Sequence, residues 1–292
     1  MTWRTVVISR RSKLFFKMGH MVIRDFENKI TKIYLKDISH VILTTTEISI
    51  TAALMNEFQK QKIKLIISDE KGNPSAELTP LYNSFNSTEK IKAQIKWKKT
   101  TKQYLWQLII KEKIKKQMYH LKDKGLDEYK LLETYINQVR LNDKTNREAH
   151  AAKVYFNALF GKNFSRNDSS SLNACLNYGY AIILSTINRT LVSMGYLTQL
   201  GIFHDNMFNQ FNLSSDIIEV WRILIDMEVC NMDYNVFDSC KKINLISILN
   251  QKVKFDGKTY FVNQAIYLYC KSIIDALNEN DISLVRFPEY EL

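Results

Sequence analysis

The chain has 292 residues, 46% of them hydrophobic, so it can bury a sizeable core and fold into two domains. Its formal net charge of +11 attracts polyanions, most often nucleic acid, although ribosome-associated, membrane-surface and functionally inert proteins can be equally basic. No apolar run approaches about 18 residues and no secretory signal begins the chain, so we expect neither secretion nor a membrane span.

Residues 3–68 consist of short, β-branched apolar runs separated by turn or charged residues: WRTVVI, KLFF, HMVI, KIYL, HVILT and KLIIS. Such runs are typical of strands, and they predict a small antiparallel β domain. The segment 49–61 is rich in helix formers, so one helix is expected to interrupt the strands.

The composition changes at residues 71–88, KGNPSAELTPLYNSFNST, where prolines lie among residues that favour turns. We place the domain boundary there, with a β domain over 1–80 and a helical domain over 81–292. Within the second domain, VKFDGKTYFV predicts one hairpin with a two-residue type I′ turn at Asp256-Gly257. The predicted fold class is α+β, a small N-terminal antiparallel β domain followed by a larger all-α domain.

A helical pattern over residues 87–124 combines an apolar stripe with many lysines, which we expect on the opposite face. That face is either simply solvated or in contact with DNA, and the sequence does not separate the two readings. Lys96 and Lys99 are the candidates for DNA contact in this helix. Further along, residues 172–196 predict one long helix with a buried face and with Asn173, Asn177 and Arg189 available to polar partners.

The four cysteines, at 175, 230, 240 and 270, form no C-x-x-C pair, so we expect reduced thiols in a cytoplasm rather than disulfides or structural zinc. The phosphate cradle of P-loop enzymes, the dinucleotide-binding glycine pattern and the G-x-S-x-G elbow do not occur in the sequence. ATPase, dehydrogenase and α/β-hydrolase activities are therefore not expected.

Three residues form a candidate metal site: Glu148 in the segment NRE, His204 after a glycine-containing loop, and Glu219 beyond it. Two carboxylates and an imidazole suit a Mg²⁺ or Mn²⁺ ion that must also hold phosphate oxygens and water. This set predicts a metal-dependent phosphodiester enzyme.

Each of these residues also has a purely structural interpretation. Thr145-x-x-Glu148 matches a capping box, and Asp216 could cap a helix whose first turn contains Glu219. His204 could be a loop histidine held by one hydrogen bond. The neighbouring His150 is not expected to bind one ion together with Glu148, because residues i and i+2 of a helix point to different faces.

The order of Glu148, NACLNYGYA, GIFH and Asp216-Ile-Ile-Glu219 resembles the CRISPR-associated spacer-acquisition integrases, particularly their type II-A branch. The resemblance implies that Glu148, His204 and Glu219 are the catalytic metal ligands. It also implies that Asp216 and Asn177 support the ligands, and that Tyr178 contacts DNA, a role that we extend to Lys96, Lys99 and Arg189. Two features depart from the family pattern: the third ligand is often Asp, and YLTQLGIFH contains no proline before the histidine.

The resemblance further implies that prespacer 3′-OH ends are joined to CRISPR repeat DNA by transesterification. It implies a homodimer formed through the β domains and a complex with a small ferredoxin-like companion protein. A ring-shaped DNA-binding protein and an effector nuclease of the same locus are further expected partners. Two other functions stay open at this point: a stand-alone metal-dependent nuclease for branched DNA, and a non-catalytic DNA-binding scaffold.

Overall fold

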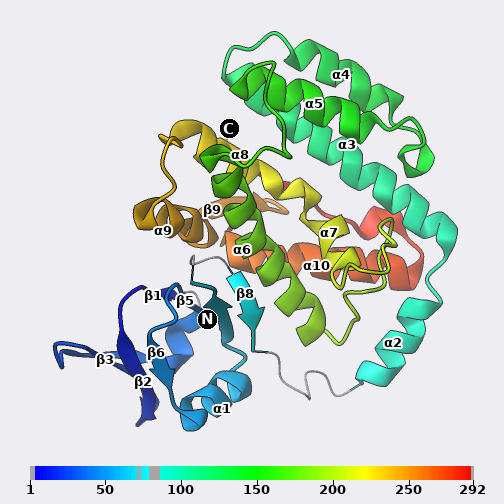
Figure 1. The fold of residues 1–292 in the computed structure, drawn as a ribbon. Helices are drawn as coiled ribbons and strands as arrows, with labels where there is room; N and C mark the ends of the chain where they lie inside the picture. Colours follow the sequence, from blue (N-terminus) through cyan, green and yellow to red (C-terminus); the bar gives the residue numbers. More distant parts are fainter. Residues whose placement is uncertain (1–3, 71–73, 79–85, 291–292) are drawn as a thin grey trace. The chain divides into compact units, whose positions relative to one another are not determined.

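The computed structural model describes residues 4–70, 74–78 and 86–290, and the chain forms two compact units (Figure 1). The first unit comprises Met1–Tyr82 together with Leu249–Gln251, and the second comprises Asn83–Ile248 and Lys252–Leu292. The predicted boundary at residues 80 and 81 lies outside the described residues. The assignment of the short segment Leu249–Gln251 to the first unit was not foreseen.

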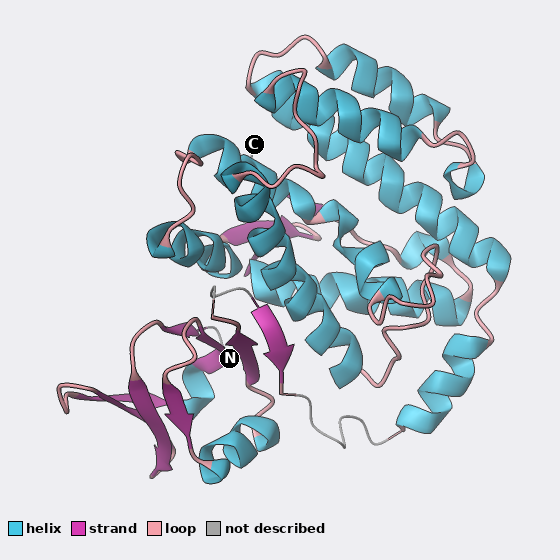
Figure 2. Ribbon diagram, viewed as in Figure 1, coloured by secondary structure: helices cyan, strands magenta, loops and turns pink. Residues whose placement is uncertain are grey.

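The first unit contains two four-stranded sheets (Figure 2). One has the order β1 (Arg4–Ile8), β5 (Ile38–Leu43), β7 (Lys64–Ser68) and β8 (Pro74–Glu77), and the other has β4 (Ile30–Tyr34), β3 (His20–Asp25), β2 (Ser12–Lys17) and β6 (Ile48–Ile50). The predicted strands are present, but the wholly antiparallel arrangement is wrong. β5 pairs with β1 and β7 in parallel, and β2 pairs with β6 in parallel.

The parallel pairing of β5 with β7 depends on helix α1 (Ala52–Lys60), which lies between these two strands in the chain. Parallel strands need a long crossover, and a helix supplies it. The Thr51 hydroxyl accepts a hydrogen bond from the Leu54 backbone N–H at the start of α1. Leu54 and Phe58, one turn apart, are buried in the core of this unit. The helix predicted over 49–61 is thus confirmed, with a later start.

The second unit is mainly helical, as predicted. Its helices are α2 (Ser87–Ile95), α3 (Lys99–Asp123), α4 (Tyr129–Gln138), α5 (Arg147–Phe160), α6 (Ser171–Ser193), α7 (Asn212–Ile217), α8 (Arg222–Asn231), α9 (Ser239–Ser247) and α10 (Val262–Glu279). A small sheet contains β9 (Lys252–Phe255), β10 (Lys258–Phe261) and β11 (Pro288–Glu289). The predicted hairpin is confirmed, because β9 and β10 are antiparallel and both Asp256 and Gly257 have positive φ.

The basic segment 87–124 is not one amphipathic helix. It breaks between α2 and α3 at Trp97, whose indole Nε1 is 2.9 Å from Asn278 Oδ1 of α10. Beyond the break, α3 packs against α4 and α5 (Figure 1), and its middle is buried on several sides. Lys113 and Lys116 are therefore buried, contrary to the predicted lysine-rich outer face.

The long helix predicted from the NACLNYGYA motif is α6. Gly179 brings it close to α8, because a Cβ atom at this position would lie 2.5 Å from Ile225 Cγ2. This close contact positions Tyr180 of α6 beside the first turn of α8. All four cysteines are free thiols, and no helix in the described ranges is long and apolar enough to cross a membrane.

Candidate active site

A cavity of about 370 Å³ lies in the second unit, between α3, α5, α6, α8 and the loop before α7. It is strongly polar, and all three predicted metal ligands line it. The lining residues are Lys113, Lys116, Gln117, Glu148, Ala152, Phe156, Arg166, Tyr180, His204, Glu219, Arg222, Ile223 and Asp226. Residues more than 50 positions apart in the sequence thus meet at one site.

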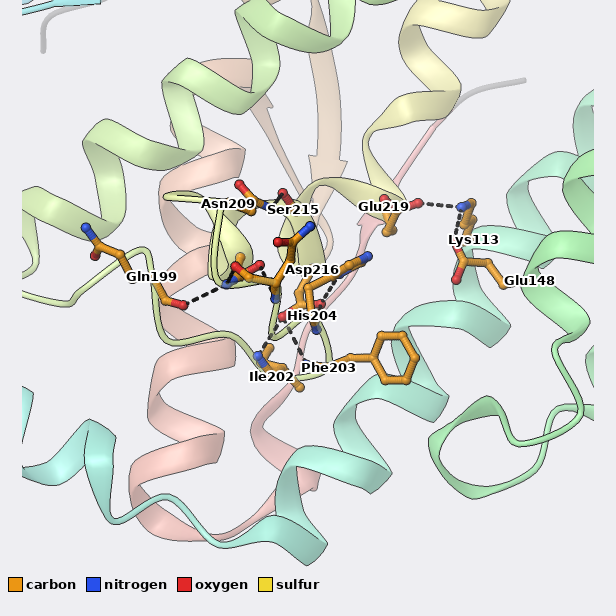
Figure 3. Close-up of polar contacts among 12 residues, drawn as sticks. Lys113, Glu148, Gln199, Ile202, Phe203, His204, Asn209, Ser215, Asp216 and Glu219 are labelled. Atoms are coloured by element: carbon orange, nitrogen blue, oxygen red, sulfur yellow. Dashed lines mark hydrogen bonds and ion pairs between the residues drawn. The ribbon is translucent and has the colours of Figure 1, made fainter. Parts of the chain in front are cut away.

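Glu148 lies in the first turn of α5, but it does not cap that helix. The Asp143 carboxylate accepts the backbone N–H groups of Arg147 and Glu148, at 2.9 and 3.0 Å. Thr145 donates its hydroxyl to the Gln138 carbonyl instead of capping α5. The capping-box interpretation is therefore wrong, and the Glu148 carboxylate extends to Lys113 Nζ at 2.7 Å (Figure 3).

Glu219 lies in a 3₁₀ turn, Ile218–Val220, between α7 and α8, and not in the first turn of a helix capped by Asp216. Its side chain is 4% exposed and contacts both Lys113 Nζ and, at 2.8 Å, Arg222 Nε. Burial opposes the charged carboxylate, but Arg222 and Lys113 outweigh this effect and lower the pKa of Glu219 to about 2. Glu219 is therefore an anion at neutral pH.

Asp216 holds His204 in place. It is fully buried, and its two oxygens accept the backbone N–H groups of Ile202, Phe203 and His204, at 2.6, 3.0 and 3.1 Å. The His204 ring donates Nδ1–H to Asp216 Oδ1 at 2.6 Å, which leaves Nε2 available to a ligand. This hydrogen bond raises the pKa of His204, against the opposing effect of burial. The contacts are those of a residue that supports the candidate ligand.

Gly201 allows this loop to fold tightly. A Cβ atom at Gly201 would lie 2.3 Å from the His204 carbonyl oxygen and 2.8 Å from Asp216 Oδ2. We expect Gly201→Ala to displace His204 and to reduce the strand joining that the family resemblance implies by about 100-fold, as misplacement of a reacting group by about 1 Å does. Joining is measured beside thermal unfolding.

Gly125→Ala is the control for the loss of stability in this experiment. A Cβ atom there would meet nothing within 4 Å, but φ is +70°, so we expect a cost of about 1 kcal/mol from the left-handed conformation. Joining should be unchanged in this variant. Full activity in Gly201→Ala would contradict the role of the tight loop.

Arg166, Arg222 and Tyr180 also line the cavity. Arg166 donates Nη2–H to Asn177 Oδ1 and Nη1–H to Asn173 Oδ1, both at 2.6 Å. The Arg222 guanidinium lies 4.7 Å from the centre of the Tyr180 ring. Asn177 therefore contacts a residue of the cavity lining, Arg166, and its predicted supporting role stays a prediction.

Asp226 is 1% exposed and accepts a hydrogen bond from the Tyr180 hydroxyl. Burial raises the pKa of Asp226 to about 6. Because the folded-state pKa lies above the unfolded value, the protonated form stabilises the fold, and this stability is lost as pH rises through about 6. Between pH 4 and pH 8 we expect the wild type to lose about 2–3 kcal/mol of unfolding free energy relative to Asp226→Asn, which has no carboxyl group to titrate at this position. Chemical unfolding at both pH values measures it, and a pH-independent difference would contradict it.

The predicted DNA contacts occupy different environments. Lys96 and Lys99 are exposed at the junction of α2 and α3, and Arg189 is half-buried on α6 outside the cavity lining. Tyr178 is only 2% exposed, and its ring packs against Phe237 at a centroid distance of 5.4 Å. This burial speaks against a direct DNA contact for Tyr178, because a buried ring is not accessible to a base or a phosphate.

Whether a divalent ion fits depends on the donors and on Lys113. As they stand, no three His, Cys, Asp or Glu side chains of the described residues are arranged to hold a metal. The Lys113 ammonium instead bridges Glu148 and Glu219 (Figure 3). The donor types nevertheless fit Mg²⁺ or Mn²⁺, since two carboxylates already bind a cation and His204 lines the same cavity. Lys113, Arg166 and Arg222, which also line the cavity, were not among the predicted site residues.

Comparison with known proteins gives consistent matches. The family model described as CRISPR associated protein Cas1 matches residues 5–233. The CRISPR-associated endonuclease Cas1 of Neisseria meningitidis serogroup C (strain 8013) is 36% identical over 295 residues, covering 99% of this chain and 97% of the relative. A casposase bound to integration product has a similar fold, with a TM-score of 0.77, 18% identity and coverage of 98% and 93%. A chain of a Cas6-RT-Cas1–Cas2 complex matches with a TM-score of 0.72 and 17% identity over 96% of this chain, which spans only 35% of that longer chain.

Proposed function

The chain belongs to the Cas1 family. We propose that it is a metal-dependent DNA endonuclease and integrase of CRISPR adaptation, of the type II-A branch. The main support for this proposal is that Glu148, Glu219 and His204 line one cavity. The identity of 36% to a Cas1 endonuclease over nearly the whole chain supports the same reaction class. The substrates would be prespacer DNA and leader-repeat DNA.

In this proposal Glu148, His204 and Glu219 hold Mg²⁺ or Mn²⁺. The bound ion would supply Lewis-acid polarisation of a phosphodiester. Asp216 orients the His204 ring and keeps its Nδ1 protonated, so that Nε2 is the nitrogen available to the metal ion. Arg166 and Arg222, which line the same cavity, would contribute positive charge near the phosphate oxygens.

The proposed reaction is a transesterification. The prespacer 3′-OH gives up its proton and its oxygen forms a new bond to a repeat phosphorus, the bond to the repeat's own 3′-oxygen breaks, and that leaving oxygen takes up a proton. One phosphodiester replaces another, so the exchange is nearly thermoneutral and needs no nucleotide cofactor. Water in place of the 3′-OH would give endonuclease activity at the same site.

We extend the proposal to the partners. A matched structure is a Cas6-RT-Cas1–Cas2 complex, and we propose that this chain likewise works with a small ferredoxin-like companion protein. It would form a homodimer through its N-terminal unit, in the cytoplasm of a prokaryote. A ring-shaped DNA-binding protein and an effector nuclease of the same locus are further proposed partners.

An integration assay tests the proposed function. It combines a prespacer duplex with free 3′-OH ends, a supercoiled leader-repeat plasmid, the companion protein, and Mn²⁺ or Mg²⁺. We expect covalent joining at the repeat boundary that is lost with 3′-dideoxy ends and with His204→Ala. Salt-sensitive DNA binding without joining or cleavage would instead indicate a scaffold. Cleavage of branched DNA without a partner, and no joining with one, would indicate a stand-alone nuclease.

The exposed lysines at the α2–α3 junction give a separate prediction about DNA affinity. We expect Lys96→Ala combined with Lys99→Ala to weaken binding equally for different prespacer sequences, and to reduce the slope of log affinity against log salt by about 2. Fluorescence anisotropy at several salt concentrations measures this slope. The control pair, Lys252→Ala with Lys258→Ala, removes two exposed lysines of the β9–β10 hairpin. An equal effect of both pairs would show that only net charge matters.

A further inference from the structure

The Lys113 ammonium lies between the two glutamates that we propose as metal ligands. Its Nζ is 2.7 Å from Glu148 Oε1 and also contacts Glu219 Oε2 (Figure 3). The Lys113 side chain is only 10% exposed, so solvent screens these contacts weakly. Both carboxylates therefore already bind a cation, and this cation belongs to the chain itself.

We propose that Lys113 is a resident counter-ion, which holds the carboxylates of Glu148 and Glu219 and would be displaced from them by a divalent ion. The inference rests on the proposed function, because it takes both glutamates as ligands of Mg²⁺ or Mn²⁺. It assigns to Lys113 the control of metal affinity.

The charges around the cavity show why a counter-ion is needed. Without a cation, the carboxylates of Glu148 and Glu219 would face each other in a partly buried site and repel. Lys113 pairs with both carboxylates, and Arg222 pairs with Glu219. Burial opposes the ammonium, but the attraction to Glu219 and Glu148 is stronger and raises the pKa of Lys113. Lys113 is therefore a cation at neutral pH and stabilises the two carboxylates.

The same ammonium competes with a divalent ion for the same oxygens. A bound divalent ion would bring two further positive charges to these ion pairs, and Lys113 would lose its place between the carboxylates. Lys113 stays on α3, where it lines the cavity. The surplus of positive charge then attracts a phosphodiester, so binding of the metal and binding of the DNA phosphate are coupled.

Lys116 provides the matched control. It lies on the same helix, is also buried and also lines the cavity, but its Nζ binds Glu112 Oε1 and the Pro288 carbonyl oxygen, both at 2.7 Å. Its removal takes away one nearby positive charge without freeing a proposed ligand. Any general electrostatic effect on cation binding is thus measured by Lys116→Met.

The test is Mn²⁺ affinity of the full-length protein, measured from the EPR signal of free Mn²⁺. We expect Lys113→Met to bind Mn²⁺ about tenfold tighter or more than the wild type, because no ammonium has to be displaced. Lys116→Met should stay within about twofold of the wild type, and Lys113→Arg, which keeps the charge, should bind no tighter. Unchanged or weaker binding by Lys113→Met would overturn the inference.

A second measurement needs no variant. We expect acylation of Lys113 by an amine-reactive reagent, followed by mass spectrometry, to increase when Mn²⁺ is added to the wild type, since the ammonium is released into the cavity. Unchanged labelling would also overturn the inference. Glu219→Gln distinguishes failure of this inference from failure of the proposed metal site. If the metal site itself is wrong, Glu219→Gln will bind Mn²⁺ no more weakly than the wild type.

Discussion

Replacing Asp216 with alanine is expected to cost about 3–5 kcal/mol of folding free energy and to reduce strand joining by about 100-fold or more. The substitution removes the acceptor of three backbone N–H groups and of the His204 ring in a fully buried position. Each buried donor left without an acceptor costs about 1–3 kcal/mol, partly relieved when water enters. Urea unfolding and the integration assay measure the two effects.

Asp238→Ala is the control for this substitution. Asp238 also accepts a backbone N–H group, that of Lys241 at 2.9 Å, but it is exposed at the start of α9. We expect a loss of about 1 kcal/mol, typical of an N-cap, and unchanged joining. If Asp216→Ala were as stable and as active as Asp238→Ala, the loop would not depend on Asp216 for its conformation.

The features that the sequence predicted best are those with local causes. The long apolar periodicity around NACLNYGYA predicted α6, and the Asp256-Gly257 pair predicted the β9–β10 hairpin, because turn geometry and helix periodicity depend on neighbours in the chain. Glu148, His204 and Glu219 do line one cavity. That agreement came from the order of the motifs in a family, since no local rule brings residues so distant in sequence together.

The features that were not predicted from the sequence depend on contacts between residues that are not neighbours in a local motif. Thr145-x-x-Glu148 satisfies a local capping rule, but Asp143 reaches the same N–H groups through a turn in which Asn142, Asp143 and Asn146 all have positive φ. The parallel pairing of β1, β5 and β7 is equally non-local. Strand patterns in the sequence show which residues are buried, but not which strand lies beside which.

Lys113 could have been found from the sequence. It follows Leu105 and Ile109 at intervals of four residues, so it continues the apolar stripe of α3 and not its polar face. A lysine on a buried stripe needs an anionic partner, because an unpaired buried charge is costly. The many other lysines of the segment mask the position of Lys113 on the apolar stripe, because together they resemble one basic face. The identity of the partners, Glu148 and Glu219, could come only from the folded chain.

Glu219→Gln is expected to abolish strand joining, a loss of about 1,000-fold or more, because it removes a proposed ligand that is held as an anion. It should also cost about 2–4 kcal/mol of stability, since Lys113 and Arg222 each lose a charged partner in a buried environment. The integration assay and urea unfolding at pH 7 measure both. The fold should persist, because Lys113 keeps its contact with Glu148.

Glu112→Gln separates the two effects of this substitution. Glu112 binds Lys116, whose side chain is 6% exposed, so its loss also leaves a buried lysine without its carboxylate. Glu112 does not line the cavity, and we assign it no role in metal binding. We expect a comparable loss of stability with normal joining. If Glu219→Gln joined DNA within about tenfold of Glu112→Gln, its carboxylate could not be a metal ligand, because a missing ligand costs several kcal/mol in the transition state.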